Sequence, residues 1–125
     1  MKLVGFDLQE IDAGRTYGQL VITQDHLQQT GLIHGGVTAT VADIVSGFAA
    51  YTTVPDTHHV VTAELRISYL RPGKGSVIAA EGRVLKSGEK LIFCESDVWA
   101  IDKDQRTLIA KASAIMATIQ PANSQ

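Results

Sequence analysis

The feature that most constrains the fold is the apolar segment from Val37 to Tyr51. Its sequence, VTATVADIVSGFAAY, contains a single charged residue, Asp43. This composition and spacing predict one helix that is apolar on nearly every side. Such a helix cannot lie on a surface with one face in water, so other parts of the chain must wrap around it.

The second half of the chain has the pattern of long strands that could do this wrapping. Residues 60–70 alternate, with Val61, Ala63, Leu65, Ile67 and Tyr69 on one face and Thr62, Glu64, Arg66 and Ser68 on the other. Further strands are predicted at residues 77–86, 90–101 and 106–119, separated by turns at 71–75, 87–88 and 102–105. Strands this long form an antiparallel sheet that can curl around one helix.

Two shorter strands are expected before the helix, at residues 3–12 and 17–23, joined by a turn at Gly14-Arg15-Thr16. Together these elements predict an α+β fold, in which a long curved antiparallel sheet wraps around one buried helix. Residues 1–120 are expected to form one domain, and residues 121–125 a flexible tail.

Composition narrows the functional classes. A net charge of −2 without runs of Lys or Arg argues against nucleic acid or an anionic membrane as the main partner. One cysteine, Cys94, excludes a disulfide framework and leaves too few ligands for a thiolate zinc site. Because an acid follows within seven residues of the start, no secretory signal is recognised. We therefore expect a cytoplasmic protein that needs no metal or cofactor.

The last predicted strand suggests an oligomer. Leu108, Ala110, Ala112, Ala114 and Met116 share one face, but Ile109, Ile115, Ala117 and Ile119 make the other face apolar as well. One sheet over one helix would leave that second face in water. We expect this face, or a free sheet edge, to be buried between copies of the chain.

Asp43 is the first candidate for chemistry. Its helical neighbours three, four and seven residues away are all small, so a strand, a second subunit or a ligand could approach the carboxylate closely. A carboxylate within an apolar helix is rare unless it is paired or functional. The alternatives are a general base and a structural acid that binds a hydroxyl or water.

The start of the helix is the second candidate. No Ser, Thr, Asp or Asn directly precedes it, so another group must satisfy its first N–H groups. Gly35 and Gly36 would let a ligand touch the backbone, where free N–H groups could stabilise a negative oxygen. Alternatively, the two glycines only allow a tight turn. His34 lies too far from Asp43 along the helix for a direct pair, so it is assigned a positioning or structural role.

Other polar residues carry weaker signals. His58 and His59 are adjacent and lack a third metal ligand, so surface positions are expected. Cys94 alternates within a strand and is predicted to fill the core. No GxSxG, GxGxxG or P-loop sequence occurs. A nucleotide-bearing ligand would therefore rely on cations at the strand turns, which are otherwise ordinary solvated residues: Arg71, Lys74, Lys86 and Lys90.

Four motifs in combination resemble a known family. They are GLIHGGV at residues 31–37, VAD at 41–43, ELRISYLRP at 64–72 and EGRV at 81–84. Over residues 30–119 the chain resembles the hotdog-fold thioesterases of the phenylacetate-degradation (PaaI-like) type. The resemblance implies a hotdog fold, a dimer with sheets paired edge to edge and active sites at its interface, and usually a dimer of dimers.

The resemblance also implies hydrolysis of an acyl-coenzyme A (acyl-CoA) thioester. Asp43 would be the general base or nucleophile, and the Gly35 N–H would polarise the thioester carbonyl. Gln28 matches an Asn or Gln near that carbonyl, and Thr62 matches a Ser or Thr that orients water. The acyl chain would lie beside the helix, and the nucleotide would lie on the surface near Gly36 and the turn cations.

Two other functions remain open. Hydratase or dehydratase chemistry on this fold needs a His and an acid poised together, which the spacing of His34 and Asp43 disfavours. A non-catalytic acyl-CoA binding module is the second alternative, although binding alone gains nothing from a desolvated carboxylate.

Overall fold

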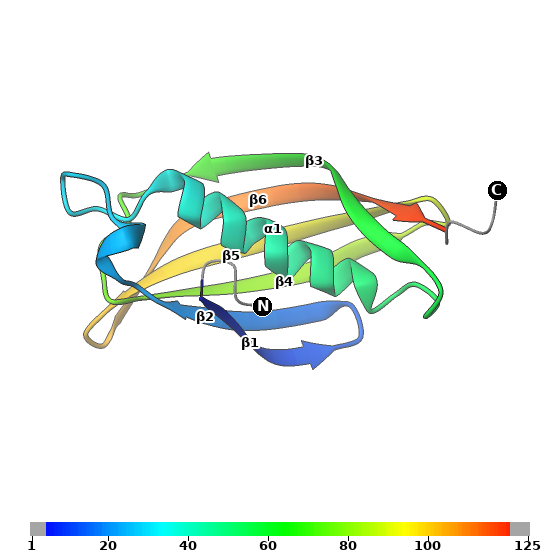
Figure 1. The fold of residues 1–125 in the computed structure, drawn as a ribbon, viewed down its shortest axis with the longest axis horizontal. Coiled ribbons are helices and arrows are strands. Elements are labelled where there is room, and N and C mark those ends of the chain that lie inside the picture. Colours follow the sequence, from blue (N-terminus) through cyan, green and yellow to red (C-terminus); the bar gives the residue numbers. More distant parts are fainter. Residues whose placement is uncertain (1–4, 121–125) are drawn as a thin grey trace.

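The computed structural model describes residues 5–120, in which one α-helix packs against a six-stranded antiparallel sheet (Figure 1). The elements are β1 (Phe6–Asp12), β2 (Arg15–Val21), the 3-10 helix η1 (Gln24–His26), α1 (Gly35–Tyr51), β3 (His59–Tyr69), β4 (Val77–Ser87), β5 (Leu91–Asp102) and β6 (Gln105–Ile119). The predicted α+β fold is confirmed. Residues 3 and 4 of the first expected strand and the tail at 121–125 lie outside the described residues.

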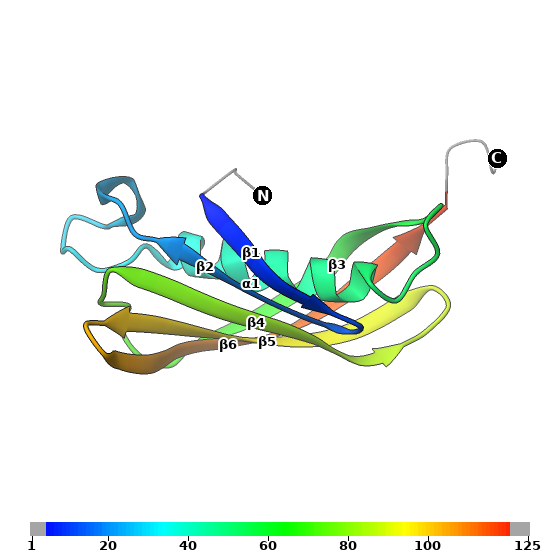
Figure 2. The ribbon, with the colours of Figure 1, turned by 90° about the horizontal axis from the view of Figure 1, so that it is seen from below.

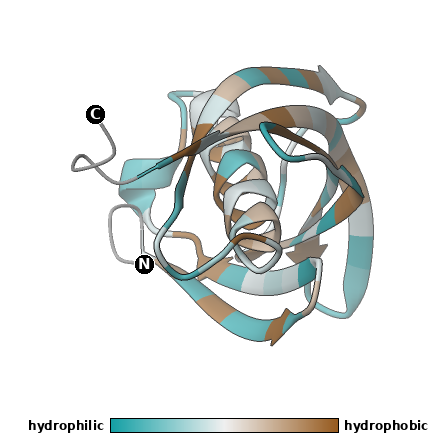
Figure 3. Ribbon diagram, turned by 90° about the vertical axis from the view of Figure 1, so that its right-hand side faces the viewer, coloured by the Kyte–Doolittle hydropathy of each residue, from teal (hydrophilic) through white to brown (hydrophobic). Residues whose placement is uncertain are grey.

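The strand order is β1-β2-β4-β5-β6-β3, so β1 and β3 form the two edges of the sheet. Figure 2 shows the sheet from the side, with α1 lying across its concave face, and Figure 3 shows the sheet curling around the helix. The predicted wrapping is therefore confirmed. No helix within residues 5–120 is long and apolar enough to cross a membrane.

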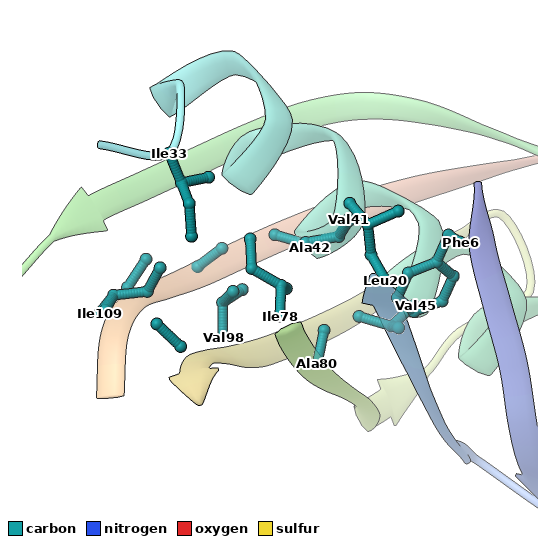
Figure 4. Close-up of a cluster of buried hydrophobic side chains, with 13 residues drawn as sticks. Phe6, Leu20, Ile33, Val41, Ala42, Val45, Ile78, Ala80, Val98 and Ile109 are labelled. Atoms are coloured by element: carbon teal, nitrogen blue, oxygen red, sulfur yellow. The ribbon is translucent and has the colours of Figure 1, made fainter. Parts of the chain in front are cut away.

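The core lies between α1 and the concave face of the sheet (Figure 4). Val41, Ala42 and Val45 of the helix are fully buried there. The Thr16 hydroxyl donates a hydrogen bond of 2.7 Å to the Val45 carbonyl. A Cβ at Gly82 would lie 2.3 Å from that same oxygen, so only glycine allows this contact between sheet and helix. These contacts fix which side of α1 meets the sheet.

The alternation predicted for β3 is wrong in its first half. The pairing of β3 with β6 shifts between Thr62 and Glu64, which is the signature of a β-bulge. Val60 packs into the core together with Leu65, and the Thr62 side chain reaches the helix. The extra residue at Ala63 moves Thr62 to the helix side, whereas Val61 is 45% exposed.

A second bulge corrects the prediction for β6. Val98 pairs with Ala110 and Trp99 with Leu108, so Ile109 is the inserted residue. Ile109 is buried in the core rather than on the outer face, and Leu108 is only half-buried. At the other end of the sheet, the first turn is shorter than expected: Asp12 already pairs with Arg15, and Gly14 supplies the positive φ of +75° that the turn needs.

The outer face of the sheet, turned away from α1, carries linked ion pairs at its centre. This outer-face network consists of Arg15, Glu81, Arg83, Glu95, Asp97 and Lys111. Its members lie opposite or diagonal to one another on neighbouring strands, where side chains on one face of a sheet are in contact. The three cations of the network balance its three carboxylates.

Candidate active site

Asp43 lies midway along α1, on the side that the sheet leaves open. Its side chain is half-buried, and its Oδ1 atom accepts a 2.6 Å hydrogen bond from the Thr62 hydroxyl of β3. No Lys, Arg or His of the described chain forms an ion pair with it. The structure thus brings together two predicted site residues that are nineteen positions apart in the sequence.

A groove of about 450 Å³ runs beside Asp43, between α1 and the first half of β3. The groove is lined mainly by apolar and small side chains: Thr40, Asp43, Ile44, Gly47, Phe48, Tyr51, His59, Val60 and Thr62. Phe48 and Tyr51 of α1 belong to this lining, whereas Leu65 of β3 packs against the core clusters. The carboxylate therefore faces a hollow suited to an apolar group.

The start of α1 leaves one amide free. The His34 carbonyl accepts from the Val37 and Thr38 N–H groups at 3.0 and 3.3 Å, and His34 Nδ1 accepts from the Gly36 N–H at 2.9 Å. Across residues 5–120, no partner is found for the Gly35 N–H. Of the two glycines, Gly35 can therefore offer its N–H to a ligand, while the Gly36 N–H is already used.

His34 is thus the missing helix cap. Its backbone is extended, with φ −62° and ψ 133°, as expected for the residue before a first helical turn. Sequence reasoning placed His34 in a positioning or structural role but did not identify this hydrogen bond, because histidine is not among the usual capping residues. His34 and Asp43 are separated along the helix and do not form a pair.

Gln28 lies close to the helix start. Together with Gly35, Gly36 and Tyr69, it lines a second hollow of about 340 Å³. Within it the Tyr69 hydroxyl donates a 2.7 Å hydrogen bond to the Gly35 carbonyl. Tyr69 was predicted only as a strand residue, and no sequence signal links it to a glycine thirty-four positions earlier.

The predicted cations lie at two ends of the molecule. Arg71 follows β3 near the start of α1 and donates a 2.8 Å hydrogen bond to the Leu108 carbonyl. Lys86, near the end of β4, and Lys90, just before β5, are exposed near the other end of the helix. Within one chain these cations do not form a single cluster.

The remaining candidates have structural surroundings. Cys94 is buried, as predicted, and burial raises the pKa of its thiol to about 11. His59 is exposed, as predicted, but it lines the groove, and His58 is half-buried. Within the described range, 5–120, no group of three His, Cys, Asp or Glu side chains could hold a metal ion.

A family model described as the thioesterase superfamily matches residues 30–107, which hold the helix start, Asp43 and Thr62. The chain belongs to the thioesterase superfamily. The hotdog fold implied by the sequence resemblance is therefore confirmed for this superfamily member.

Individual proteins are similar to this chain in sequence and in fold. Human acyl-coenzyme A thioesterase 13 is 31% identical over 86 residues, which are 68% of this chain and 61% of that protein. A Bacillus halodurans protein solved with CoA has a TM-score of 0.83 and 28% identity, covering 95% of this chain and 77% of that one. A thioesterase family protein from Silicibacter pomeroyi has the same fold, with a TM-score of 0.92, 24% identity and coverage of 94% and 87%.

The chain spans between half and two thirds of the length of several curated relatives. The matched segments make up 52% of a Caenorhabditis elegans protein, 66% of one from Saccharolobus solfataricus and 61% of the human enzyme.

Proposed function

We propose that this protein hydrolyses acyl-CoA thioesters to a free acid and CoA. The observation that carries the proposal is the Asp43 carboxylate, which within residues 5–120 is bound only by the Thr62 hydroxyl and which faces an apolar groove of about 450 Å³. Asp43 acts as the general base or nucleophile on the thioester, and Thr62 orients the carboxylate or the attacking water. The thioesterase and CoA-bound relatives support this reaction.

The Gly35 N–H is the proposed donor to the thioester carbonyl oxygen. A thioester is already activated, so one base and one such donor suffice; a base contributes about 10²–10⁴-fold and a donor about 3 kcal/mol. Gln28, in the same hollow as Gly35, is placed to contact the carbonyl as well. Gly36 gives a substrate close access to the backbone.

One chain does not bring the base and the donor together. Asp43 and Gly35 are eight residues apart on α1, which corresponds to about 12 Å along the helix axis. A single thioester cannot contact both groups at hydrogen-bond distance. We infer that each active site combines Asp43 and Thr62 of one protomer with the Gly35 N–H of its partner.

Pairing of two β3 strands would create this arrangement. β3 is an edge strand whose outer backbone groups have no partner strand in the described part of the chain, and Val61 and Tyr69 on it are 45% and 55% exposed. Edge strands readily pair with a second chain. Thr62 and Tyr69 are equally far from the point between Leu65 and Arg66. Antiparallel pairing about that point would place each Thr62 opposite the partner's Tyr69, which lies beside Gly35 of its own chain.

The same pairing would unite the cations. Opposite ends of β3 become neighbours in an antiparallel pair, so Arg71 of one protomer approaches the end of its partner that carries Lys86 and Lys90. We assign these three side chains to the phosphates of CoA. The dimer would thus bring together cations that lie far apart within one chain.

A second interface would give a dimer of dimers. Leu85, Leu91, Phe93 and Ile119 are between 39% and 61% exposed on the outer face, beyond the outer-face network. Together with half-buried Ile115 they form an apolar patch of the kind that commonly marks a protein interface. We propose that two dimers pack through this patch.

The reaction is tested by thiol release from aromatic, short-chain and medium-chain acyl-CoA thioesters, with wild type and Asp43→Asn measured side by side. Hydrolysis of at least one thioester, reduced by about a hundredfold or more in a folded Asn variant, is expected. No turnover with acyl-CoA still bound would contradict the proposal and identify a binding module.

A further inference from the structure

The peptide group between Gly35 and Gly36 is held at both ends. Its carbonyl oxygen accepts a 2.7 Å hydrogen bond from the Tyr69 hydroxyl of β3. Its N–H donates a 2.9 Å hydrogen bond to His34 Nδ1. The orientation of this peptide plane is therefore set by two side chains, one local and one from the sheet edge.

This restraint is needed because two consecutive glycines begin the helix. Glycine has the widest backbone freedom of any residue, so the first turn of α1 would otherwise sample several orientations. The Gly35 N–H has no partner in the part of the chain that the structure describes. It belongs to the same residue whose carbonyl Tyr69 holds. Any rotation about the Gly35 backbone redirects the neighbouring peptide groups.

Contact as well as hydrogen bonding links Tyr69 to this glycine. A Cβ built on Gly35 would lie 3.4 Å from the Tyr69 ring and from its hydroxyl, which is ordinary van der Waals contact. The ring thus covers one side of Gly35. His34 bonds only the N–H end of this peptide group, and Tyr69 bonds its carbonyl end.

We propose that Tyr69 is a positioning residue for the thioesterase reaction. It holds the Gly35 carbonyl so that the adjacent Gly35 N–H points at the thioester oxygen, and it acts through Gly35 rather than on the substrate. This role rests on the proposed function. It also gives each β3 a part in both sites of the dimer, since Thr62 on the same strand holds the Asp43 that belongs to the other site.

The test is a double-mutant cycle on kcat and KM with the best acyl-CoA of the panel. Tyr69→Phe removes only the hydroxyl, and we expect kcat to fall about tenfold while KM and the melting temperature change little. Gly35→Pro removes the donor N–H itself, and in that background Tyr69→Phe should have no further effect on kcat. Tyr17→Phe is the matched control, because its hydroxyl accepts a 3.1 Å bond from Gln19 on the outer face; its kcat should match wild type.

The outcomes separate the two claims. If the wild type turns over and Tyr69→Phe is as active, or if Tyr69→Phe costs the same tenfold with and without the Gly35 N–H, the role of Tyr69 is overturned while the reaction stands. If the wild type hydrolyses none of the thioesters, the proposed function fails, and the positioning role fails with it.

Discussion

Two carboxylates on opposite sides of the sheet have contrasting surroundings. Asp97, in the outer-face network, is bound by Arg83 at 3.1 Å and by Lys111, and its side chain is 15% exposed. Asp43, beside the groove, is bound by one neutral hydroxyl. A carboxylate held by two cations has its oxygens committed to structure, whereas one held by a hydroxyl keeps an oxygen available to a substrate or water. The contrast separates an acid that stabilises the fold from one that can react.

The difference between Asp43 and Asp97 is tested most sharply by replacing each acid with its amide. Asp43→Asn should lower kcat/KM by about 10²–10⁴-fold, because the proposed base is lost. Asp97→Asn should leave kcat/KM nearly unchanged. Steady-state kinetics on both variants, with circular dichroism to verify folding, checks the pair; an equal loss of activity in both would show that the two acids are not functionally distinct.

The helix start can be tested with two substitutions at one position. Gly35→Pro deletes the free N–H, and proline is favoured at a first helical position after an extended residue such as His34. We expect kcat to fall about 10²–10³-fold, as when an oxyanion donor is removed. Gly35→Ala keeps the N–H and adds only a methyl group against Tyr69, so it should retain most activity. Similar losses in the two variants would mean that the N–H is not the donor.

The outer-face network should make stability depend on pH. Burial alone would raise the pKa of Asp97, but hydrogen bonds from Lys111 and Arg83 prevail and lower it. A lowered pKa in the folded state means that ionised Asp97 stabilises the fold above the ordinary carboxyl pKa of about 4, and that this contribution is lost as pH falls through the folded-state value.

Asp97→Asn should therefore lower the free energy of unfolding by about 1–3 kcal/mol near pH 7, and by less at low pH. Urea denaturation between neutral and acidic pH measures this difference. A gap between wild type and variant that stays constant down to the lowest pH would contradict the assigned role.

The smallest expected effect concerns Thr62. Thr62→Val preserves the shape of the side chain but removes the hydroxyl that binds Asp43, and we expect kcat/KM to fall about tenfold. Thr62→Ser keeps the hydroxyl and should remain close to wild type. If Val and Ser variants have the same rate, the hydrogen bond to Asp43 has no part in the reaction.

The elements of this fold follow from local patterns. The apolar run around Asp43 predicts the helix, and alternation predicts the strands, because both depend on neighbours within a few residues. The two bulges could not be predicted in this way. Ala63 and Ile109 each shift the phase of a strand by one residue, and nothing in the composition around them marks the insertion.

For the site, too, the sequence predicts residues with a local signal but not the contacts between distant residues. Asp43 and Gly35 stand out because a lone acid and a pair of glycines are unusual in an apolar helix and at its start. The hydrogen bonds from Thr62 to Asp43 and from Tyr69 to Gly35 join residues that are far apart in sequence. The role of Thr62 is predicted by the family resemblance. The role of Tyr69 is not predicted, because its partner is a backbone carbonyl.

The central claim is that each active site is shared by two protomers, and subunit complementation tests it most directly. Asp43→Asn and Gly35→Pro chains are each nearly inactive alone, but a mixed dimer would contain one site with both Asp43 and the Gly35 N–H intact. After the two variants are unfolded together and refolded at equal concentration, we predict recovery of about a quarter of the wild-type rate, as random pairing in a two-fold dimer requires. No recovery in a mixture shown to contain mixed dimers would contradict a shared site and place base and donor in the same chain.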